Sequence, residues 1–295
     1  MALTRLPLRA LLLCFTVLLC TGGGSAAGAL PTSTALTAPV MPAPVDCPGC
    51  WHPPLEVSWE WQLSSVPKPP FLPVQVYDID GFAASPQVVA DLHTSLPGRR
   101  VICYLSTGSW ESWRPDAKQF PKAVKGRPLD GWPGERWVDI RRFSGRLGTI
   151  MRARLDMCAA KGFDAVEFDN ADGYLNRTGF ALKGADQLAY NAWLANEAHA
   201  RGLSAVLKND LPQIPKLLPY YDMALSEQCW QYAECTTAQN GGFGLDQFVE
   251  AGKPVFHVEY QLPPKQFCAR SNRQNFNSLR KRLALGAYRV PCRGS

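Results

Sequence analysis

Histidine is scarce in this sequence, with four residues in 295. The histidines form no cluster, so the sequence does not indicate a metal site built from histidine ligands. The motif Cys47-Pro48-Gly49-Cys50 has the spacing of a zinc knuckle, but no second close pair of cysteines or histidines completes it. The motif also adjoins a proline-rich stretch instead of preceding a helix, which argues against a redox centre. We therefore predict neither a metal nor a cofactor.

The sequence also lacks the motifs of nucleotide and nucleic-acid binding. No glycine-rich phosphate loop follows the first predicted strand, which argues against a nucleotide-binding fold. The net charge of +6 becomes 6 − 2 = +4 once Arg5 and Arg9 are left out with the N-terminal segment, and no basic run is interleaved with aromatic residues, so nucleic acid is not indicated. The basic residues near the C-terminus are expected on an exposed helix: Arg270, Arg273, Arg280, Lys281 and Arg282.

The apolar run at residues 10–20 is too short to cross a bilayer, because a spanning helix needs about 20 residues. It follows two arginines and precedes a stretch of small residues, so residues 1–29 are predicted to be a secretory signal peptide, cleaved near Ala27 or Ala29. The mature protein is then expected outside the cell, without membrane contact and with an oligomeric state that the sequence leaves open. Residues 30–46, rich in Pro, Thr and Ala, predict a flexible linker, and residues 47–295 predict one domain.

Ten cysteines are present, of which two, Cys14 and Cys20, fall in the predicted signal peptide. The other eight are an even number, which in an exported chain indicates disulfide bonds. Cys229 and Cys235 flank a short loop and are the clearest candidate pair. Cys103 lies in a predicted strand, and Cys158 is its candidate partner. The remaining connectivity is left open.

Short apolar runs alternate with longer segments of helical periodicity. The segments 143–161 and 186–201 have apolar residues at helical spacing, and a glycine follows the end of each. Strands are predicted at residues 57–63, 72–79, 100–105, 165–168, 203–207, 223–226, 254–258 and, with the weakest pattern, 283–290. Strand, helix and strand in repetition indicate parallel strands with crossovers. Eight such strands predict an α/β fold, a (β/α)8 TIM barrel, with an open doubly wound sheet as the alternative.

Polar residues follow six of these strands. Side chains alternate along a strand, so Glu167 and Asp169 share one face although their charges repel. The carboxyl ends of parallel barrel strands meet at one face, where the active sites of such barrels lie. Solvated loop starts would explain one or two of the polar endings but not six. We expect a pocket for a polar ligand whose binding residues are Asp78, Asp80, Tyr104, Trp110, Glu167, Asn170, Asp172, Lys208, Asn209, Gln228, Glu259 and Tyr260.

Two carboxylates across a cleft, with aromatic residues nearby, fit glycoside hydrolysis. One carboxyl group donates a proton to the leaving oxygen, and the other attacks the anomeric carbon or activates water. Indole rings can stack on the apolar faces of sugars, and seven tryptophans lie near the predicted strands or their loops. Among them, Trp59, Trp61 and Trp137 are expected in the core.

The segment 101–116, with the sequence VICYLSTGSWESWRPD, resembles the third-strand signature of glycoside hydrolase family 114, the endo-α-1,4-polygalactosaminidases. The resemblance extends from Val57 to the C-terminus. Phe168 departs from it, because many members have proline there, and this change is expected to affect loop stiffness more than chemistry. The other similar motifs, in chain order, are WQL (61–63), YDID (77–80), WVDIR (137–141), VEFDN (166–170), DGY (172–174), LKND (207–210), EQC (227–229) and FHVEY (256–260).

The resemblance implies a barrel that cleaves α-1,4-linked galactosamine polymers within the chain and retains the anomeric configuration. It implies Asp169 as the nucleophile and Glu227 as the acid/base. The residues alone leave Glu167 open as the nucleophile, and Asp169 is preferred because it lies nearer the strand end. Lys208 is expected to keep Asp169 charged, and Trp230 is expected to shield Glu227 from water.

The implied substrate is a polycation, because deacetylated galactosamine carries an ammonium group. Acidic residues are expected to line a groove that attracts it: Asp78, Asp80, Asp172, Asp210 and Glu259. Two alternatives stay open, a glycosidase that cleaves a neutral α-galactoside and a barrel that binds polysaccharide without cutting it. Asn176-Arg177-Thr178 also matches a glycosylation sequon.

Overall fold

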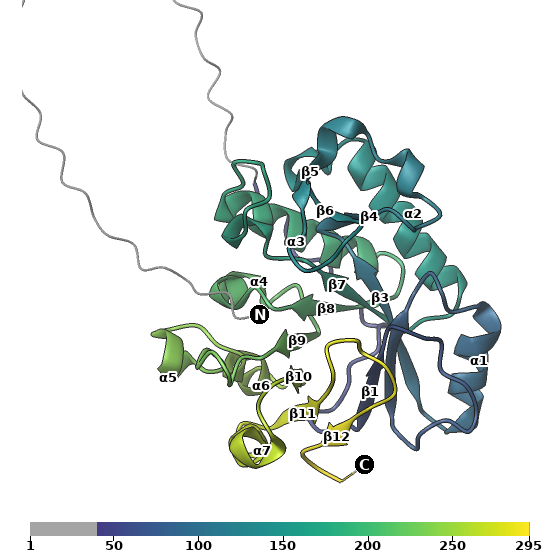
Figure 1. Ribbon diagram of the computed structural model, residues 1–295, viewed down its shortest axis with the longest axis vertical. Coiled ribbons are helices and arrows are strands. Elements are labelled where there is room, and N and C mark those ends of the chain that lie inside the picture. The colour runs from purple at the N-terminus through teal and green to yellow at the C-terminus, as the bar shows by residue number, and fades with distance from the viewer. Residues whose placement is uncertain (1–39, 295) are drawn as a thin grey trace, which may run out of the picture. The chain divides into compact units, whose positions relative to one another are not determined.

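The computed structural model describes residues 40–294 and contains a curled sheet of nine strands with helices around its outside (Figure 1). Eight of these strands are parallel to their neighbours, and the predicted TIM-type barrel is confirmed. In sheet order they are β1 (Trp59–Gln62), β2 (Val76–Asp80), β3 (Arg100–Ser106), β7 (Ala165–Asp169), β8 (Ser204–Lys208), β9 (Met223–Glu227), β10 (Val255–Glu259) and β11 (Phe276–Arg280). The predicted signal peptide lies outside the described residues.

The first and last parallel strands meet through individual hydrogen bonds. The indole Nε1 of Trp59 donates to the carbonyl oxygen of Asn277 at 2.8 Å, and the amide of Val57 donates to the side chain of Asn277 at 3.1 Å. Beyond the strands, the amide of Leu63 donates to the carbonyl of Leu285 at 2.9 Å. The short strand β12 (Val290–Pro291) adds to β11 in the antiparallel direction. The two edges of the curled sheet are thus joined mainly by side chains.

The prediction of the eighth strand at residues 283–290 is wrong, because the strand is Phe276–Arg280. Its sequence FNSLR contains two adjacent polar residues, Asn277 and Ser278, so it shows neither an apolar run nor a regular alternation. The apolar residues at 283–285 instead belong to a loop that lines the pocket described below. The expectation of one exposed basic helix is also wrong in part: Arg280 belongs to β11, and the fully buried Lys281 bonds to Glu60.

Seven α-helices are present in the described chain: α1 (Pro86–Ser95), α2 (Arg146–Ala160), α3 (Gly184–His199), α4 (Ile214–Leu217), α5 (Thr237–Asn240), α6 (Asp246–Glu250) and α7 (Pro264–Arg273). The predicted helices at 143–161 and 186–201 correspond to α2 and α3. Helix α1 begins where the hydroxyl of Ser85 accepts a hydrogen bond from the amide of Val88 and proline occupies the first helical position. Helix α2 ends just before Gly162, whose φ of 85° favours glycine.

The barrel strands separate two hydrophobic clusters by the alternation of their side chains. On β7, Val166 and Phe168 pack outward into the cluster that includes the helices. Ala165 packs inward with the cluster that fills the barrel, and Trp59 and Trp61 belong to the same inner cluster, as expected. The next inward positions on β7 are Glu167 and Asp169. The apolar filling therefore ends toward the carboxyl ends of the strands, where the charged residues begin.

A three-stranded antiparallel sheet is inserted between β3 and α2, and we did not predict it. It consists of β4 (Ser109–Glu111), β5 (Lys125–Pro128) and β6 (Glu135–Val138), in the order β4-β6-β5. The turn into β4 passes against the end of β7, because a Cβ at Gly108 would lie 1.9 Å from the carbonyl oxygen of Asn170. Glycine at this position allows the inserted sheet to reach over the end of β7.

The described part of the predicted linker packs on the barrel. The amide of Val45 donates to Asn196 Oδ1 at 3.0 Å, and Asn196 Nδ2 donates to the carbonyl of Ala43 at 2.7 Å. His199, on the same helix α3, lies 2.8 Å from the carbonyl of Val45. Residues 43–45 are therefore held by α3, and the folded region begins before Cys47.

Four disulfide bonds are present among the described residues: Cys47–Cys50, Cys103–Cys158, Cys229–Cys235 and Cys268–Cys292. The expected pairs Cys229–Cys235 and Cys103–Cys158 are confirmed. Because Cys47 and Cys50 are bonded to each other, the zinc-knuckle spacing reflects a small disulfide loop. Over residues 40–294, no helix is both long enough and apolar enough to span a bilayer.

Removal of the Cys103–Cys158 bond is expected to lower stability more than removal of the Cys47–Cys50 bond. The first bond ties β3 to α2 across 55 residues, the second spans three residues, and the entropic gain of a crosslink grows with loop length. A C103A/C158A variant should lose about 4 kcal/mol in free energy of unfolding. Urea unfolding of both double alanine variants measures the difference, and equal losses would contradict this account.

Candidate active site

Lys208, at the end of β8, lies among three carboxylates at the mouth of the barrel. Its Nζ is 2.9 Å from Glu167 Oε1, 2.9 Å from Asp169 Oδ1 and 3.4 Å from Glu227 Oε2. Burial by itself lowers the pKa of Lys208, but the three carboxylates outweigh it and raise that pKa well above the usual range. Lys208 is therefore a permanent cation that holds the ends of β7, β8 and β9 together.

Asp169 is held as a carboxylate by three donors. Lys208 contacts its Oδ1, while the hydroxyl of Tyr104 donates to Oδ2 at 2.7 Å and Asn170 Nδ2 donates to Oδ2 at 3.2 Å. Burial opposes the charge, but Lys208 and these hydrogen bonds hold the pKa of Asp169 below its ordinary value. The side chain is 20% exposed, so this ionised group can reach a ligand in the pocket.

Glu227, at the end of β9, lies on the other side of Lys208. Its Oε1 accepts from the hydroxyl of Tyr260, and its Oε2 accepts from Asn209 Nδ2 at 3.2 Å. The side chain is 25% exposed. Because Lys208 Nζ is 2.9 Å from Asp169 Oδ1 and 3.4 Å from Glu227 Oε2, these two oxygens cannot be farther apart than both distances together, 6.3 Å.

The backbone turns sharply after three strands of the site. Asn170, Asn209 and Gln228 follow β7, β8 and β9 directly and have φ values of 61°, 50° and 57°. Such left-handed conformations are uncommon for residues other than glycine, although asparagine tolerates them. Asn170 and Asn209 use these turns to contact the carboxylates of Asp169 and Glu227. The strained turns thus position donors beside the two acids.

Glu167 and Asp78 lie inside the barrel, below Asp169 and Glu227, and both are fully buried. Trp61 Nε1 donates to Glu167 Oε2 at 3.0 Å, and Lys208 bonds to Oε1. Burial, followed by the charge of Glu167, raises the pKa of Asp78 well above its usual range, so Asp78 is protonated and can donate to Glu167. With both oxygens of Glu167 occupied, Asp169 is the carboxylate of β7 that faces the pocket.

A pocket of about 510 Å³ opens above the pair and is lined by both acids. A second hollow of about 210 Å³ shares Asp169, Lys208 and Glu227 with it. The larger pocket also contains Trp113 and Trp132, whose side chains are 55% and 46% exposed. Both hollows therefore reach the two acids, and exposed indole rings are available for stacking on a sugar.

Eight of the twelve predicted binding residues line these two hollows: Asp80, Tyr104, Asn170, Asp172, Lys208, Asn209, Gln228 and Tyr260. Two more, Asp78 and Glu167, lie beneath them. Asp210, which we expected in an acidic groove, is buried and accepts a hydrogen bond from Asn191 Nδ2 at 2.9 Å. Burial raises its pKa well above the ordinary value.

The structure does not bring Trp110 and Glu259 to the pocket, contrary to our expectation. Trp110 packs against the hydrophobic core, and its Nε1 donates to the carbonyl of Ala117 at 2.9 Å. Glu259 is fully buried on the outer side of β10, where its Oε1 accepts from the amide of Trp230 at 2.9 Å. Alternation places the next residue, Tyr260, in the pocket instead.

The expectation that Trp230 shields Glu227 is also wrong. The indole Nε1 of Trp230 donates to the hydroxyl of Ser271 on α7 at 2.6 Å, and the ring packs near Phe276. Glu227 is instead contacted by Lys208, Asn209 and Tyr260, as described above. The side chain of Trp230 belongs to the wall between the barrel and α7.

Sequence reasoning missed the acidic and basic residues that the inserted sheet brings to the pocket. Arg114 bridges Asp80 and Glu111, with nitrogen–oxygen distances of 2.7 Å to each. Glu135, on β6, lines the same pocket. Glu111 and Arg114 lie in the segment 101–116 quoted above, so that signature contained a signal for them. Glu135 lies in a stretch without a recognisable motif.

The profile of glycoside-hydrolase family GH114 matches residues 42–295. The chain belongs to this family. The resemblance inferred from the motifs is therefore confirmed, and the protein is a glycoside hydrolase.

Two solved structures and one curated relative are similar to this chain. The crystal structure of Aspergillus fumigatus Ega3 in complex with galactosamine has 36% identity and a TM-score of 0.74, covering 82% of this chain and 97% of that one. The glycoside hydrolase domain of PelA from Pseudomonas aeruginosa, at 16% identity and a TM-score of 0.58, covers 79% and 97% and shows the same fold. An uncharacterized protein of Deinococcus radiodurans is 28% identical over 261 residues, or 82% of each chain.

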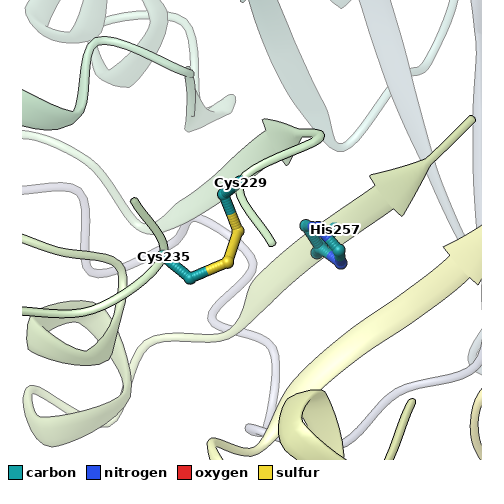
Figure 2. Close-up of side chains that lie close together, drawn as sticks. All are labelled: Cys229, Cys235 and His257. Atoms are coloured by element: carbon teal, nitrogen blue, oxygen red, sulfur yellow. A yellow bond between two sulfur atoms is a disulfide. The ribbon is translucent and has the colours of Figure 1, made fainter. Parts of the chain in front are cut away.

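One group of side chains in this GH114 barrel has the composition of a metal site. Cys229, Cys235 and His257 place their ligand atoms within 4.8 Å of one another. Figure 2 shows that the two sulfur atoms are joined as a disulfide, beside the ring of His257. A disulfide sulfur is a poor metal ligand because metal binding by cysteine uses the thiolate. His257 instead contacts Ser278 Oγ at 3.0 Å and Glu259 Oε1 at 3.2 Å.

Proposed function

We propose that this protein is a secreted endo-acting hydrolase of α-1,4-linked galactosamine polymers. The observation that carries the proposal is the pair Asp169 and Glu227, held on one lysine where two hollows share the same lining residues. The combined space of these hollows suits a sugar chain longer than one unit. Ega3, a relative at 36% identity, has been crystallised with galactosamine, which supports the sugar. Four disulfides and the predicted signal peptide support export.

The separation of the two acids favours retention of configuration. Retaining glycosidases have carboxyl groups about 5–5.5 Å apart, while inverting enzymes need about 6.5–9.5 Å to admit a water molecule. Asp169 Oδ1 and Glu227 Oε2, the two oxygens that contact Lys208, are at most 6.3 Å apart. This short approach is compatible with direct attack by a carboxylate, which we propose over attack by a water between the two groups.

In the first step, a carboxylate oxygen of Asp169 attacks the anomeric carbon while Glu227 gives its proton to the glycosidic oxygen. The bond from that oxygen to the anomeric carbon breaks, and a covalent glycosyl–Asp169 ester forms. In the second step, the Glu227 carboxylate takes a proton from water, and the hydroxide attacks the same carbon and frees Asp169. Lys208 and Tyr104 hold Asp169 ionised and oriented between the steps.

Product analysis tests the proposal directly. Incubation with a deacetylated α-1,4-galactosamine polymer should give short oligosaccharides of mixed length by mass spectrometry, because an endo-acting enzyme cuts within the chain. Proton NMR should show α-anomers first, as retention requires. A panel of neutral α-galactosides and an N-acetylated polymer serve as controls. Cleavage of neutral polymers alone would contradict the substrate, and binding without new reducing ends would indicate a carbohydrate-binding barrel.

A further inference from the structure

Five carboxylates line the larger pocket, and they differ in their cationic partners: Asp80, Glu111, Glu135, Asp169 and Glu227. Asp80 and Glu111 share Arg114, at 2.7 Å each. Asp169 and Glu227 share Lys208. Glu135 has no ion pair with any residue in the described part of the chain. Within residues 40–294, Glu135 is therefore the one carboxylate of this pocket that forms no salt bridge.

Glu135 is nevertheless held in a defined position. It is 8% exposed and belongs to β6, which pairs with both other strands of the inserted sheet. Its Oε2 accepts from Ser109 Oγ at 2.7 Å, and Ser109 Oγ is 2.7 Å from Ser106 Oγ. Ser106 Oγ in turn accepts from Asn170 Nδ2 at 2.9 Å. These contacts fix the carboxyl group relative to the active site.

The same hydrogen-bond chain ends at the proposed nucleophile. Asn170 Nδ2 donates to Ser106 Oγ and also lies 3.2 Å from Asp169 Oδ2. Glu135 is thus connected to Asp169 through Ser109, Ser106 and Asn170, on one wall of the pocket. The second oxygen of Glu135, Oε1, has no hydrogen-bond partner among the described residues, so it can accept from a ligand.

A buried carboxylate without a cation is a costly arrangement for a folded protein. Burial, followed by the negative charges of Glu111 and Asp169, raises the pKa of Glu135 to about 7, while Ser109 and Arg114 act in the opposite direction. A cation bound next to the carboxylate would favour its ionised form. A ligand with a positive charge therefore supplies the partner that the protein chain does not.

We infer that Glu135 binds the C2 ammonium group of a galactosamine unit in the larger pocket. The inference rests on the proposed function and names the residue that selects a deacetylated sugar at that position. An ammonium group donates to carboxylate oxygens through charge-assisted hydrogen bonds. Trp113 and Trp132 lie in the same pocket with exposed rings that can cover the apolar face of the sugar. An N-acetyl group is neutral and forms no ion pair with Glu135.

Binding measurements test this inference without turnover. Deacetylated and fully N-acetylated α-1,4-galactosamine oligosaccharides are titrated calorimetrically into Glu227→Gln, which keeps Asp169 and Lys208, and into the same protein with Glu135→Gln. We expect the second change to weaken binding of the deacetylated ligand roughly 10- to 100-fold. Binding of the N-acetylated ligand should change less than about twofold, since it makes no charge contact. An equal loss for both ligands, or no loss for either, would overturn the inference.

Glu250→Gln is the matched control, because Glu250 is an exposed residue of α6 outside the pocket. It removes the same net charge, so a comparable loss of affinity in this control would assign the effect to long-range attraction and overturn the inference. Thermal unfolding checks that Glu135→Gln is folded, and Glu135→Asp, which keeps the charge, should restore part of the affinity. Failure of Glu135→Asp to differ from Glu135→Gln would also count against a charge contact.

Steady-state kinetics and the pH dependence of affinity distinguish a binding role of Glu135 from a catalytic one. In the active enzyme, Glu135→Gln should raise KM for the deacetylated polymer with little change in kcat, and a loss confined to kcat would instead place Glu135 at the reacting atoms. Between pH 8 and pH 6 Glu135 takes up a proton, which weakens its contact with the ammonium group, while protonation of the ligand's amino groups acts in the opposite direction and is common to both proteins. The ratio of the affinities of the protein with Glu135 and the Glu135→Gln variant should therefore fall from pH 8 to pH 6. Glu111, Arg114 and Asp169 face Glu135 and stay in both proteins. An unchanged pH dependence would overturn the inference.

The outcomes also distinguish the inference from the proposed function. A protein that binds the deacetylated ligand through Glu135 but gives no cleavage products would contradict the hydrolytic proposal and support the binding role. A protein that cleaves the polymer but is insensitive to Glu135→Gln would support hydrolysis and overturn the binding role.

Discussion

Asp169→Asn is expected to reduce kcat by roughly 10⁴-fold or more, since loss of a nucleophile in a hydrolase can cost up to about 10⁶-fold. Glu227→Gln is expected to reduce kcat by about 10²–10⁴-fold, the usual contribution of a general acid or base. Both changes are nearly isosteric and leave Lys208 in place, so the variants should stay folded. Reducing-end release from the deacetylated polymer measures both effects.

Asp156→Asn is the control for the aspartate variant. Asp156 forms an ion pair with Arg201 at the surface, with its side chain 64% exposed, and should leave the rate within about twofold of wild type. Wild-type activity should also fall at low pH as Asp169 takes up a proton, at a pH below that of an ordinary aspartate because its pKa is lowered. Near-full activity of either active-site variant would remove that residue from the mechanism.

Lys208→Met is expected to produce the second large effect, on both stability and activity. Removing the cation leaves the buried carboxylate of Glu167 and the partly buried carboxylate of Asp169 without their partner, and breaking a buried ion pair such as Lys208–Glu167 costs about 3–5 kcal/mol. Activity should fall at least 100-fold because the two acids lose the group that positions them. Urea unfolding and reducing-end assays on the same samples measure the two losses.

The destabilisation by Lys208→Met should depend on pH in a defined direction. In wild type, the lowered pKa of Asp169 stabilises the fold above the pKa of an unfolded aspartate, and this contribution is lost as the pH falls through the folded value. In the variant, burial without Lys208 raises the pKa of Asp169 and Glu167, so stability is lost as the pH rises. The deficit relative to wild type should therefore be larger at pH 7 than at pH 5.

Lys253→Met provides the matched control for this experiment. Lys253 donates to the carbonyl oxygens of Leu218 and Tyr221, away from the pocket. It should lose stability without losing activity per folded molecule, and without the increase of the deficit from pH 5 to pH 7. A pH-independent deficit in Lys208→Met would argue that the lysine acts by packing alone.

The barrel and the clustering of its polar strand ends followed from the sequence pattern. Seven of the eight parallel strands were found because each is a short run rich in apolar residues, and Asp169, Lys208 and Glu227 end three of them. The eighth strand was missed because Phe276–Arg280 is partly polar and meets β1 largely through side chains. A periodic pattern reveals a strand only where the buried positions of that strand carry apolar residues.

The sequence did not determine on which side of the sheet each side chain lies. Alternation correctly places Glu167 and Asp169 on one face, but the choice between Glu259 and Tyr260 depends on where the register of β10 begins, and a shift of one residue reverses it. Trp110 was assigned to the pocket from its neighbourhood in the chain. In the structure it packs into the core, while Trp113 and Trp132 line the pocket.

The sequence alone determined the fold class and the family, and the family resemblance supplied the two acids of the proposed reaction, because periodicity and short motifs are local properties of the chain. Only the tertiary structure decided which carboxylates share a cation, how near the two acids lie, and that the inserted sheet brings Glu135 to the pocket. Those features depend on residues far apart in the chain, such as Glu135 on β6 and Asp169 on β7, and no local pattern encodes their distance.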